Sequence, residues 1–233
     1  MVKHSLRDVL ASARHKKRPA LIVDVKLRSP RDGELISGER LEPYVRALEE
    51  ADVDALATPT DGQHFGGSLD AARRIRKNAT VPLMRKEFFA SVAQMDESLD
   101  TGFDAVQLTL STIPDLGLVR EMKARAEVIG LEVVVCVRTA RQLETAIDLG
   151  AAMVGIANRD ITALEMDDGT VQTTEELVSL VPADVYSISE SALLSAADVD
   201  RVAAAGADAM VIGTAIAKSD DPASMVRALR GGA

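Results

Sequence analysis

The sequence has very little of the residues that mark several common classes of protein. Cys136 is the single cysteine in 233 residues, so the chain cannot form an internal disulfide, which is compatible with a reducing cytoplasm. The three histidines, His4, His15 and His64, lie far apart and match no metal-ligand spacing. We therefore expect a cytoplasmic protein with no bound metal and no cofactor.

Long apolar runs and strongly basic stretches are also missing. No run of about 18 apolar residues occurs, so a membrane-spanning helix is not expected. The basic N-terminus has no apolar segment before a cleavage site, which argues against secretion. The formal net charge is −9 and the basic cluster ARHKKR is short, so nucleic acid is not an expected partner.

What the chain does contain is a regular alternation of short, β-branched apolar stretches with segments rich in Ala, Leu, Glu and Arg. The expected strands are residues 20–26, 53–58, 81–86, 104–110, 132–138, 152–158, 184–189 and 208–213. The segments with helical composition are residues 39–51, 68–77, 90–101, 114–129, 140–149, 172–180, 195–205 and 222–230.

Eight strand-then-helix units without a linker predict an α/β protein, a single (β/α)8 TIM barrel over residues 1–233. Residues 1–19 would form a short N-terminal helical extension. A doubly wound open sheet is the alternative, but it usually has fewer strands and a glycine-rich nucleotide fingerprint, which this sequence does not have. In a barrel of this kind the active site lies at the C-terminal ends of the strands.

Charged residues gather at those predicted strand ends. The stretch IVDVKLRSP, residues 22–30, places Asp24 and Lys26 on one face of a strand that should be buried. Burying an ion pair is costly, so a purely structural strand would carry apolar residues there. The same alternation turns Lys86 and Glu190 inward. Two lysines and a glutamate are therefore expected at one mouth, where crowded lysines can serve as acids, bases or anion ligands.

The loops after the last two strands carry a second signal. Gly213 and Thr214 begin a short helical turn after the eighth strand, and Ser191 follows the seventh. Backbone N–H groups of these loops form the recurrent phosphate site of barrels, although an ordinary glycine turn is the alternative. Taken alone, Arg159 suits a salt bridge and Cys136 a small buried apolar position.

The motifs, in this order and spacing, resemble those of the indole-3-glycerol phosphate synthase family over nearly the whole chain. VDVKLRSPRDG is similar to AEIKxxSPSxG, TDGQHFGGS to TDxxxFxGS, PLMRKEF to PxLxKDF, GIANRDI to GxNNRxL and ESAL to ESGI. The resemblance implies a carbon-carbon lyase (a carboxy-lyase) of tryptophan biosynthesis. Such an enzyme closes an indole ring from a carboxyphenylamino-deoxyribulose 5-phosphate, with loss of carbon dioxide and water.

The resemblance also implies roles for individual residues. Lys86 would be the general acid, Lys26 would assist proton transfer and orientation, and Glu190 would complete the catalytic set. Arg159 would hold the anthranilate carboxylate. The phosphate would lie on Ser29, Ser191, Gly213 and Thr214, and the other expected substrate-binding residues are Asp24, Asn158, Phe88, Cys136 and Arg138.

Several positions depart from the family pattern. Asp24 replaces a glutamate, Arg138 replaces a histidine, and Ala157 replaces the first asparagine of NNR. Ala192 replaces the glycine of ESG, which narrows the allowed backbone conformations. Cys136 occupies the place of the glutamate that is the family's usual general base, and losing one such base costs about 10²–10⁴-fold in rate.

Three functions follow from this mixture. The first is the family reaction with a relocated base, Glu190 or Asp24. The second is a repurposed paralogue, a lyase, dehydratase or isomerase acting on another phosphorylated anionic substrate, with Arg138 as an added anion ligand. The third is a non-catalytic barrel that binds a phosphorylated ligand, which the retained lysines argue against. We expect the family reaction, a phosphorylated small-molecule substrate, and a monomer or weak homo-oligomer.

Overall fold

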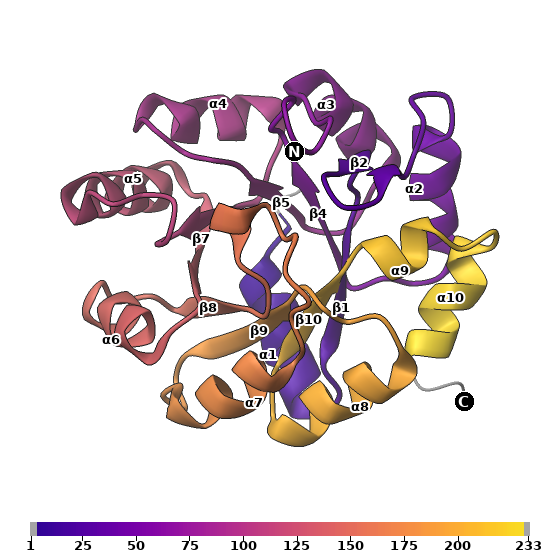
Figure 1. The fold of residues 1–233 in the computed structure, drawn as a ribbon. Coiled ribbons are helices and arrows are strands. Elements are labelled where there is room, and N and C mark those ends of the chain that lie inside the picture. Colours follow the sequence, from indigo (N-terminus) through magenta and orange to yellow (C-terminus); the bar gives the residue numbers. More distant parts are fainter. Residues whose placement is uncertain (1–3, 231–233) are drawn as a thin grey trace.

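The structure is a computed structural model that describes residues 4–230, and its centre is a closed barrel of eight parallel strands (Figure 1). Around the barrel the order is β1-β10-β9-β8-β7-β6-β5-β4, with β4 pairing back onto β1. The strands are β1 (Ala20–Asp24), β4 (Ala55–Pro59), β5 (Leu83–Lys86), β6 (Ala105–Thr109), β7 (Glu132–Val137), β8 (Met153–Ala157), β9 (Tyr186–Glu190) and β10 (Ala209–Ile212).

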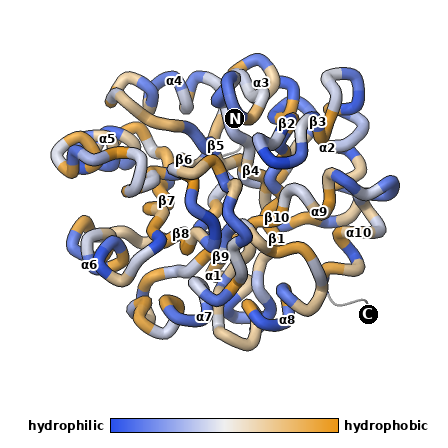
Figure 2. The backbone as a smooth tube through the Cα atoms, viewed as in Figure 1, coloured by the Kyte–Doolittle hydropathy of each residue, from blue (hydrophilic) through white to orange (hydrophobic). Residues whose placement is uncertain are grey.

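Helices surround the barrel and connect each strand to the next (Figure 1). They are α2 (Leu41–Glu50), α3 (Leu69–Asn78), α4 (Ala93–Thr101), α5 (Leu116–Ile129), α6 (Ala140–Asp148), α7 (Gln172–Leu177), η2 (Val178–Leu180), α8 (Ala196–Ala205), α9 (Thr214–Ala217) and α10 (Pro222–Leu229). Hydrophilic and hydrophobic stretches alternate along these helices (Figure 2), as expected for segments with one face on the core. No helix among residues 4–230 is long and apolar enough to cross a membrane.

Strand parity divides the core into two layers. Side chains such as Ile22, Met84, Ile188 and Val211 fill the barrel interior, and they form one cluster with the helix beneath it. The alternate residues, such as Val23, pack outward against the surrounding helices in a second, larger cluster. At the C-terminal ends of the strands, the inward-facing positions are polar, and they follow the apolar interior positions along the same face of each strand.

Helix α1 (Leu6–Lys16) closes the N-terminal end of the barrel and is visible behind the strands in Figure 1. Leu6 and Leu10 are fully buried in the interior cluster. The Arg14 guanidinium donates to both carboxylate oxygens of Asp208, at 2.6 and 2.7 Å, and the Leu6 amide donates to Glu132 at 2.6 Å. These contacts fix the helix as a plug across the strand beginnings.

The predicted fold class is confirmed, and each predicted strand overlaps an observed one to within two residues at either end. The first strand ends earlier than expected, so Lys26 lies two residues beyond β1. Two small elements were not predicted: the hairpin of β2 (Arg28–Ser29) with β3 (Gly33–Glu34), and η1 (Ile161–Ala163). Both lie in loops at the barrel mouth, where no hydrophobic alternation marks them.

Candidate active site

An open cavity of about 650 Å³ lies at the carboxyl ends of the strands. It takes one or more residues from most of the strands or from the loops that follow them. The lining residues are Asp24, Lys26, Pro59, Asp61, Phe65, Lys86, Glu87, Phe88, Gln107, Thr109, Thr112, Cys136, Ala157, Arg159, Ile161, Glu165, Glu190 and Ser191.

Lys86 lies at the centre of the charged groups in this cavity. Its Nζ is 3.4 Å from Glu190 Oε2 and 3.8 Å from Asp24 Oδ2, and 19% of its side chain is exposed. Burial alone lowers the pKa of Lys86, but the carboxylates of Asp24 and Glu190 outweigh it and hold the pKa above its ordinary value. The lysine is therefore a charged ammonium at neutral pH, able to donate a proton.

Glu190 reaches Lys86 from β9, which lies on the other side of the barrel from β5. Only 2% of the residue is exposed, and burial raises the pKa of its carboxyl, with Lys86 opposing the rise. The side chain fits because Gly155 on the neighbouring β8 has no side chain. A Cβ at position 155 would lie 2.1 Å from Glu190 Oε1. Gly155 thus creates the space that the carboxylate occupies.

Lys26 reaches the same cavity from the loop after β1. Its Nζ is 3.3 Å from Glu165 Oε2 and 3.9 Å from Asp24 Oδ2, and it lies 5.6 Å from the centre of the Phe65 ring. Asp24 is thus within ion-pair distance of both lysines, which explains why the charged face of the first strand is buried. The pairs are desolvated but not isolated, since each ammonium has a carboxylate neighbour.

Glu165 is a cavity residue that the sequence analysis did not identify. It lies in the loop between η1 and α7, and its Oε1 accepts a hydrogen bond of 2.8 Å from the Ser191 hydroxyl. Burial raises the pKa of the Glu165 carboxyl, but Lys26 and Lys86 outweigh it and lower the pKa to about 2. The carboxylate is therefore ionised at any physiological pH.

Several buried polar atoms of the described residues have no hydrogen-bond partner, and four of them belong to residues that line the cavity. They are Asp24 Oδ1, Gln107 Oε1, Glu190 Oε1 and Arg159 Nε. Leaving such groups without a partner is costly, because a buried acceptor or donor loses its hydration. Three acceptors and one donor on the walls are suited to a ligand that carries hydroxyl or amine donors and an anionic acceptor.

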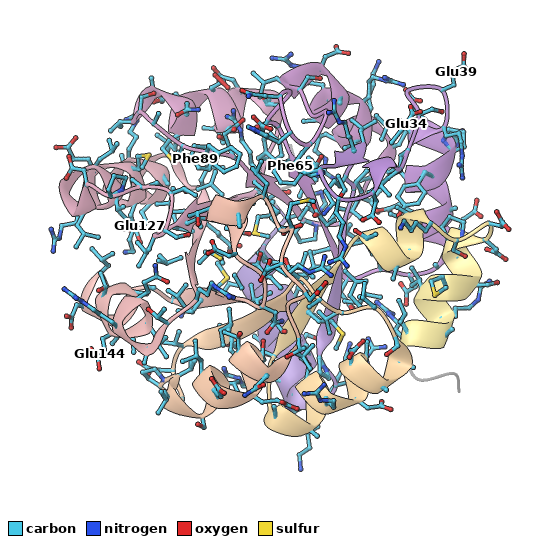
Figure 3. All side chains as sticks on the ribbon, in the orientation of Figure 1. Glu34, Glu39, Phe65, Phe89, Glu127 and Glu144 are labelled. Carbon is cyan, nitrogen blue, oxygen red and sulfur yellow. The ribbon has the colours of Figure 1, made fainter. Side chains whose placement is uncertain are left out.

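One wall of the cavity is aromatic. The rings of Phe65 and Phe88 stack with their centres 6.3 Å apart, and His64 meets Phe88 edge-on at 5.9 Å. Phe65 is labelled in Figure 3, on the loop between β4 and α3. A planar aromatic ligand can pack against such a surface with its polar edge toward the charged groups.

A second, smaller cavity of about 380 Å³ adjoins the first, beside β9 and β10. Ser191, Gly213 and Thr214, which were predicted to hold phosphate, all line it. Ser191 and Ala192 have φ of 65° and 58°, the left-handed conformation that suits the glycine of the family motif. Ala192 therefore adopts a backbone conformation that glycine reaches without steric cost, and it bears some backbone strain.

The two departures that bear on catalysis, Cys136 and Ala157, both line the main cavity. Burial raises the pKa of the Cys136 thiol well above its usual value, and Glu190 raises it further. The thiol is consequently neutral at physiological pH and cannot take the place of an ionised carboxylate. Glu190 and Asp24 are carboxylates of the same cavity that could do so.

The structure does not bring three of the predicted ligands into either cavity. The amide of Asn158 is fully occupied, donating to Ser189 and Ser191 and accepting from Thr174. Arg138 follows the end of β7, where its own N–H donates to Gln142, and its side chain turns to Asp167 at 3.7 Å.

Ser29 is the third of these residues. It belongs to the β2–β3 hairpin, where its hydroxyl donates to Asp32 at 3.3 Å. By contrast Phe88, Arg159 and Asp24 do line the main cavity, and Arg159 lines both cavities. All ten of the other predicted site residues line one or both cavities at the barrel mouth.

Among the residues that sequence reasoning missed, Gln107 left a readable signal. It lies in the stretch DAVQLTL, where alternation places it on the same face as Ala105 and Thr109, toward the interior. Nothing in the sequence indicates that Glu165 lies in the site, because its loop has neither the alternation of a strand nor the periodicity of a helix. Within residues 4–230 no group of three or more His, Cys, Asp or Glu side chains is arranged to hold a metal ion.

Comparison with known proteins bears on this arrangement. A family model described as indole-3-glycerol phosphate synthase matches residues 2–229. The chain is 36% identical to the indole-3-glycerol phosphate synthase of Pyrococcus furiosus over 92% of each chain. It is 34% identical to that of Burkholderia vietnamiensis, over 93% of this chain and 83% of the relative.

The fold also matches solved structures of barrels. One is the N-acetylmannosamine-6-phosphate 2-epimerase from Clostridium perfringens, with a TM-score of 0.71 and 17% identity, over 97% of this chain and 96% of that one. At this identity the match supports the barrel alone. The family model and the relatives, by contrast, extend over nearly the whole chain. On their strength, the protein belongs to the indole-3-glycerol phosphate synthase family.

Proposed function

We propose that this protein catalyses the family reaction, closing an indole ring from a carboxyphenylamino-deoxyribulose 5-phosphate with loss of carbon dioxide and water. The observation that carries the proposal is the Lys86 ammonium held between Glu190 and Asp24 at the barrel mouth. Ring closure turns a carbonyl oxygen into a hydroxyl group, which then leaves as water. Both steps need a proton donor at that oxygen, and a buried ammonium supplies one.

The walls of the cavity support a location for each part of this substrate. The aromatic ring would pack on Phe65 and Phe88, and its carboxylate would pair with Arg159, whose Nε has no other partner. The phosphate would enter the second cavity beside Ser191 and Gly213. The sugar hydroxyls and the amine would then face the unpartnered acceptors.

Glu190 is the proposed replacement for the base that Cys136 has lost. Its pKa is raised by burial, so it accepts a proton more readily than an ordinary glutamate, whereas Glu165 is held ionised with a pKa of about 2. The chain thus divides the acid and base roles between Lys86 and Glu190, two groups already in contact.

The direct test is an assay with the family substrate, following the fluorescence of the indole product. The wild-type protein should form the product, and Glu190→Gln should reduce the rate by about 10²–10⁴-fold, the usual contribution of one general base. The acidic limb of the wild-type rate profile should lie above the usual glutamate pKa, since burial raises it. Absence of indole product at every pH tested would refute the proposal.

A double variant tests whether the pocket still serves this reaction. Cys136→Glu with Ala157→Asn restores two of the family residues that the cavity lacks, and we expect it to increase the indole-forming rate. A pocket rebuilt for another substrate would respond in the opposite way, because the new carboxylate would have no role in it. The monomeric or weakly oligomeric state and the cytoplasmic location stay predictions, the first open to light scattering.

A further inference from the structure

Glu165 lies where the two cavities of the site meet. Both cavities are lined by a shared set of residues: Asp24, Lys26, Lys86, Arg159, Glu165 and Ser191. Of these, Glu165 is the one that comes from the long loop between β8 and α7 (Figure 1) rather than from a strand or its immediate end. A ligand that spans both cavities must therefore pass its side chain.

The groups that Glu165 contacts are the ones expected to serve a substrate. The Ser191 hydroxyl, a predicted phosphate ligand, donates to Glu165 Oε1 at 2.8 Å. The Lys26 ammonium lies 3.3 Å from Glu165 Oε2. A carboxylate of the protein thus pairs with one hydroxyl donor and one cation that an anionic ligand would use.

The backbone on both sides of this contact adopts an unfavourable conformation. Leu164 and Glu165 have φ of 53° and 57°, and Ser191 and Ala192 have φ of 65° and 58°, all in the left-handed region although none is glycine. Residues in this region persist where surrounding contacts hold them, and they gather at ligand clamps and switches. The next residue, Met166, is 55% exposed, so solvent lies directly outside the contact.

The remainder of the loop is tied down at some distance from Glu165. Arg31, from the turn between β2 and β3, lies 3.2 Å from Asp168 and donates to the Asp167 backbone carbonyl. The Asp160 amide donates to the Asp167 carboxylate. Movement of the Glu165 side chain can therefore occur within a loop that stays anchored at both sides.

A phosphate in the second cavity and the ionised Glu165 would repel each other across a partly buried space, where such repulsion is strong. Resting on the function proposed above, we propose that Glu165 is a specificity-determining residue, a resident anion that the substrate phosphate must displace from Lys26 and Ser191. Free small anions are then rejected, because they gain too few contacts to displace it. A complete substrate gains further contacts with Phe88 and Arg159, and these offset the cost of displacement.

The test compares binding of inorganic phosphate to the wild-type protein, Glu165→Gln and Glu144→Gln by calorimetry. Glutamine retains the length and an acceptor for Ser191 but carries no charge. Glu144 is an exposed glutamate on the outer helix α6 (Figure 3), so its variant matches the change in net charge far from the site. We expect at least tenfold tighter phosphate binding by Glu165→Gln, and wild-type affinity for Glu144→Gln.

Steady-state kinetics supply the second measurement. Inhibition of the indole-forming reaction by inorganic phosphate should strengthen at least tenfold in Glu165→Gln, with KM for the substrate equal to or below that of the wild type. A role in merely holding Lys26 in place would give the opposite result, weaker phosphate binding and a raised KM. That result would overturn the inference. Equal phosphate affinity in all three proteins would overturn it as well, and so would the absence of phosphate binding by any of them. The wild-type indole assay judges the proposed reaction separately.

Discussion

The two ends of the barrel are built from the same strands but treat their polar groups in opposite ways. At the N-terminal end, Arg14 donates to both oxygens of Asp208, and Glu132 accepts from the Leu6 amide and the Ser5 hydroxyl. At the mouth, acceptors of Asp24, Gln107 and Glu190 are left without partners. The closed end is arranged for stability, whereas the open end keeps unsatisfied groups that a ligand can complete.

The largest expected effect concerns the open end. Lys86→Ala should reduce the indole-forming rate by about 10²–10⁴-fold, because it removes the proposed proton donor. The loss of stability should be small, since water can enter the open cavity and solvate Asp24 and Glu190. Lys77→Ala, which alters an exposed lysine on α3, is the control. Kinetics and thermal unfolding of both variants check this, and near-wild-type turnover by Lys86→Ala would remove the assigned role.

A substitution at the closed end should reduce stability rather than the catalytic rate. Leu10→Ala deletes a fully buried side chain from the plug, and such changes lower the free energy of unfolding by about 2–5 kcal/mol. The rate per folded molecule should stay near that of the wild type, because α1 lies at the N-terminal end of the barrel, opposite the mouth. Denaturant titration alongside Arg7→Ala, an exposed position of the same helix, measures the effect. A strong loss of kcat without loss of stability would contradict the division between the two ends.

Gly155→Ala tests whether the position of the Glu190 carboxylate depends on the absence of a side chain at position 155 of β8. The new methyl group would fall 2.1 Å from Glu190 Oε1, so the carboxylate must move away from Lys86. We expect a rate lower by about tenfold or more with little change in stability, because the displaced atom ends a flexible side chain. Gly38→Ala, whose added carbon meets nothing within 4 Å, is the matched control. An unchanged rate would show that Glu190 need not lie where it does.

The smallest effect is expected at Ala192. Glycine adopts its left-handed conformation without the steric cost that alanine bears, about 1–2 kcal/mol, although the more flexible unfolded chain offsets part of the gain. Ala192→Gly should therefore raise the free energy of unfolding by at most about 1 kcal/mol. Chemical denaturation resolves such a shift, and a clear loss of stability would mean that the alanine side chain packs favourably enough to outweigh the strain.

Strand parity explains how much of this could be predicted from the sequence. It placed Lys86 with Met84 and Glu190 with Ile188 on the interior face, and the structure confirms both positions. Strand parity does not predict the residue at which a strand ends. By parity Arg138 should point inward, but β7 ends at Val137 and the chain turns away.

Strand parity does not predict the conformation of the loops. Ser29 was expected at the phosphate, yet its hydroxyl is used within a short hairpin, because the polar residues of a tight turn bond one another first. Glu165 enters the site only through tertiary contacts with Lys26 and Ser191. Gln107, by contrast, could have been found by the alternation that identified the lysines.

Two of the ion pairs at the mouth connect the two halves of the barrel. Lys86 with Glu190, and Lys26 with Glu165, each join the first four strands of the barrel to the last four. If the chain were cut after β6 and expressed as two fragments, one piece would hold both ammonium groups together with Asp24, and the other would hold Glu165 and Glu190. Attraction between the opposite charges would then favour reassembly of the fragments, and salt would weaken it. The charged groups of the active site would thus also contribute to specific association of the two halves of the barrel.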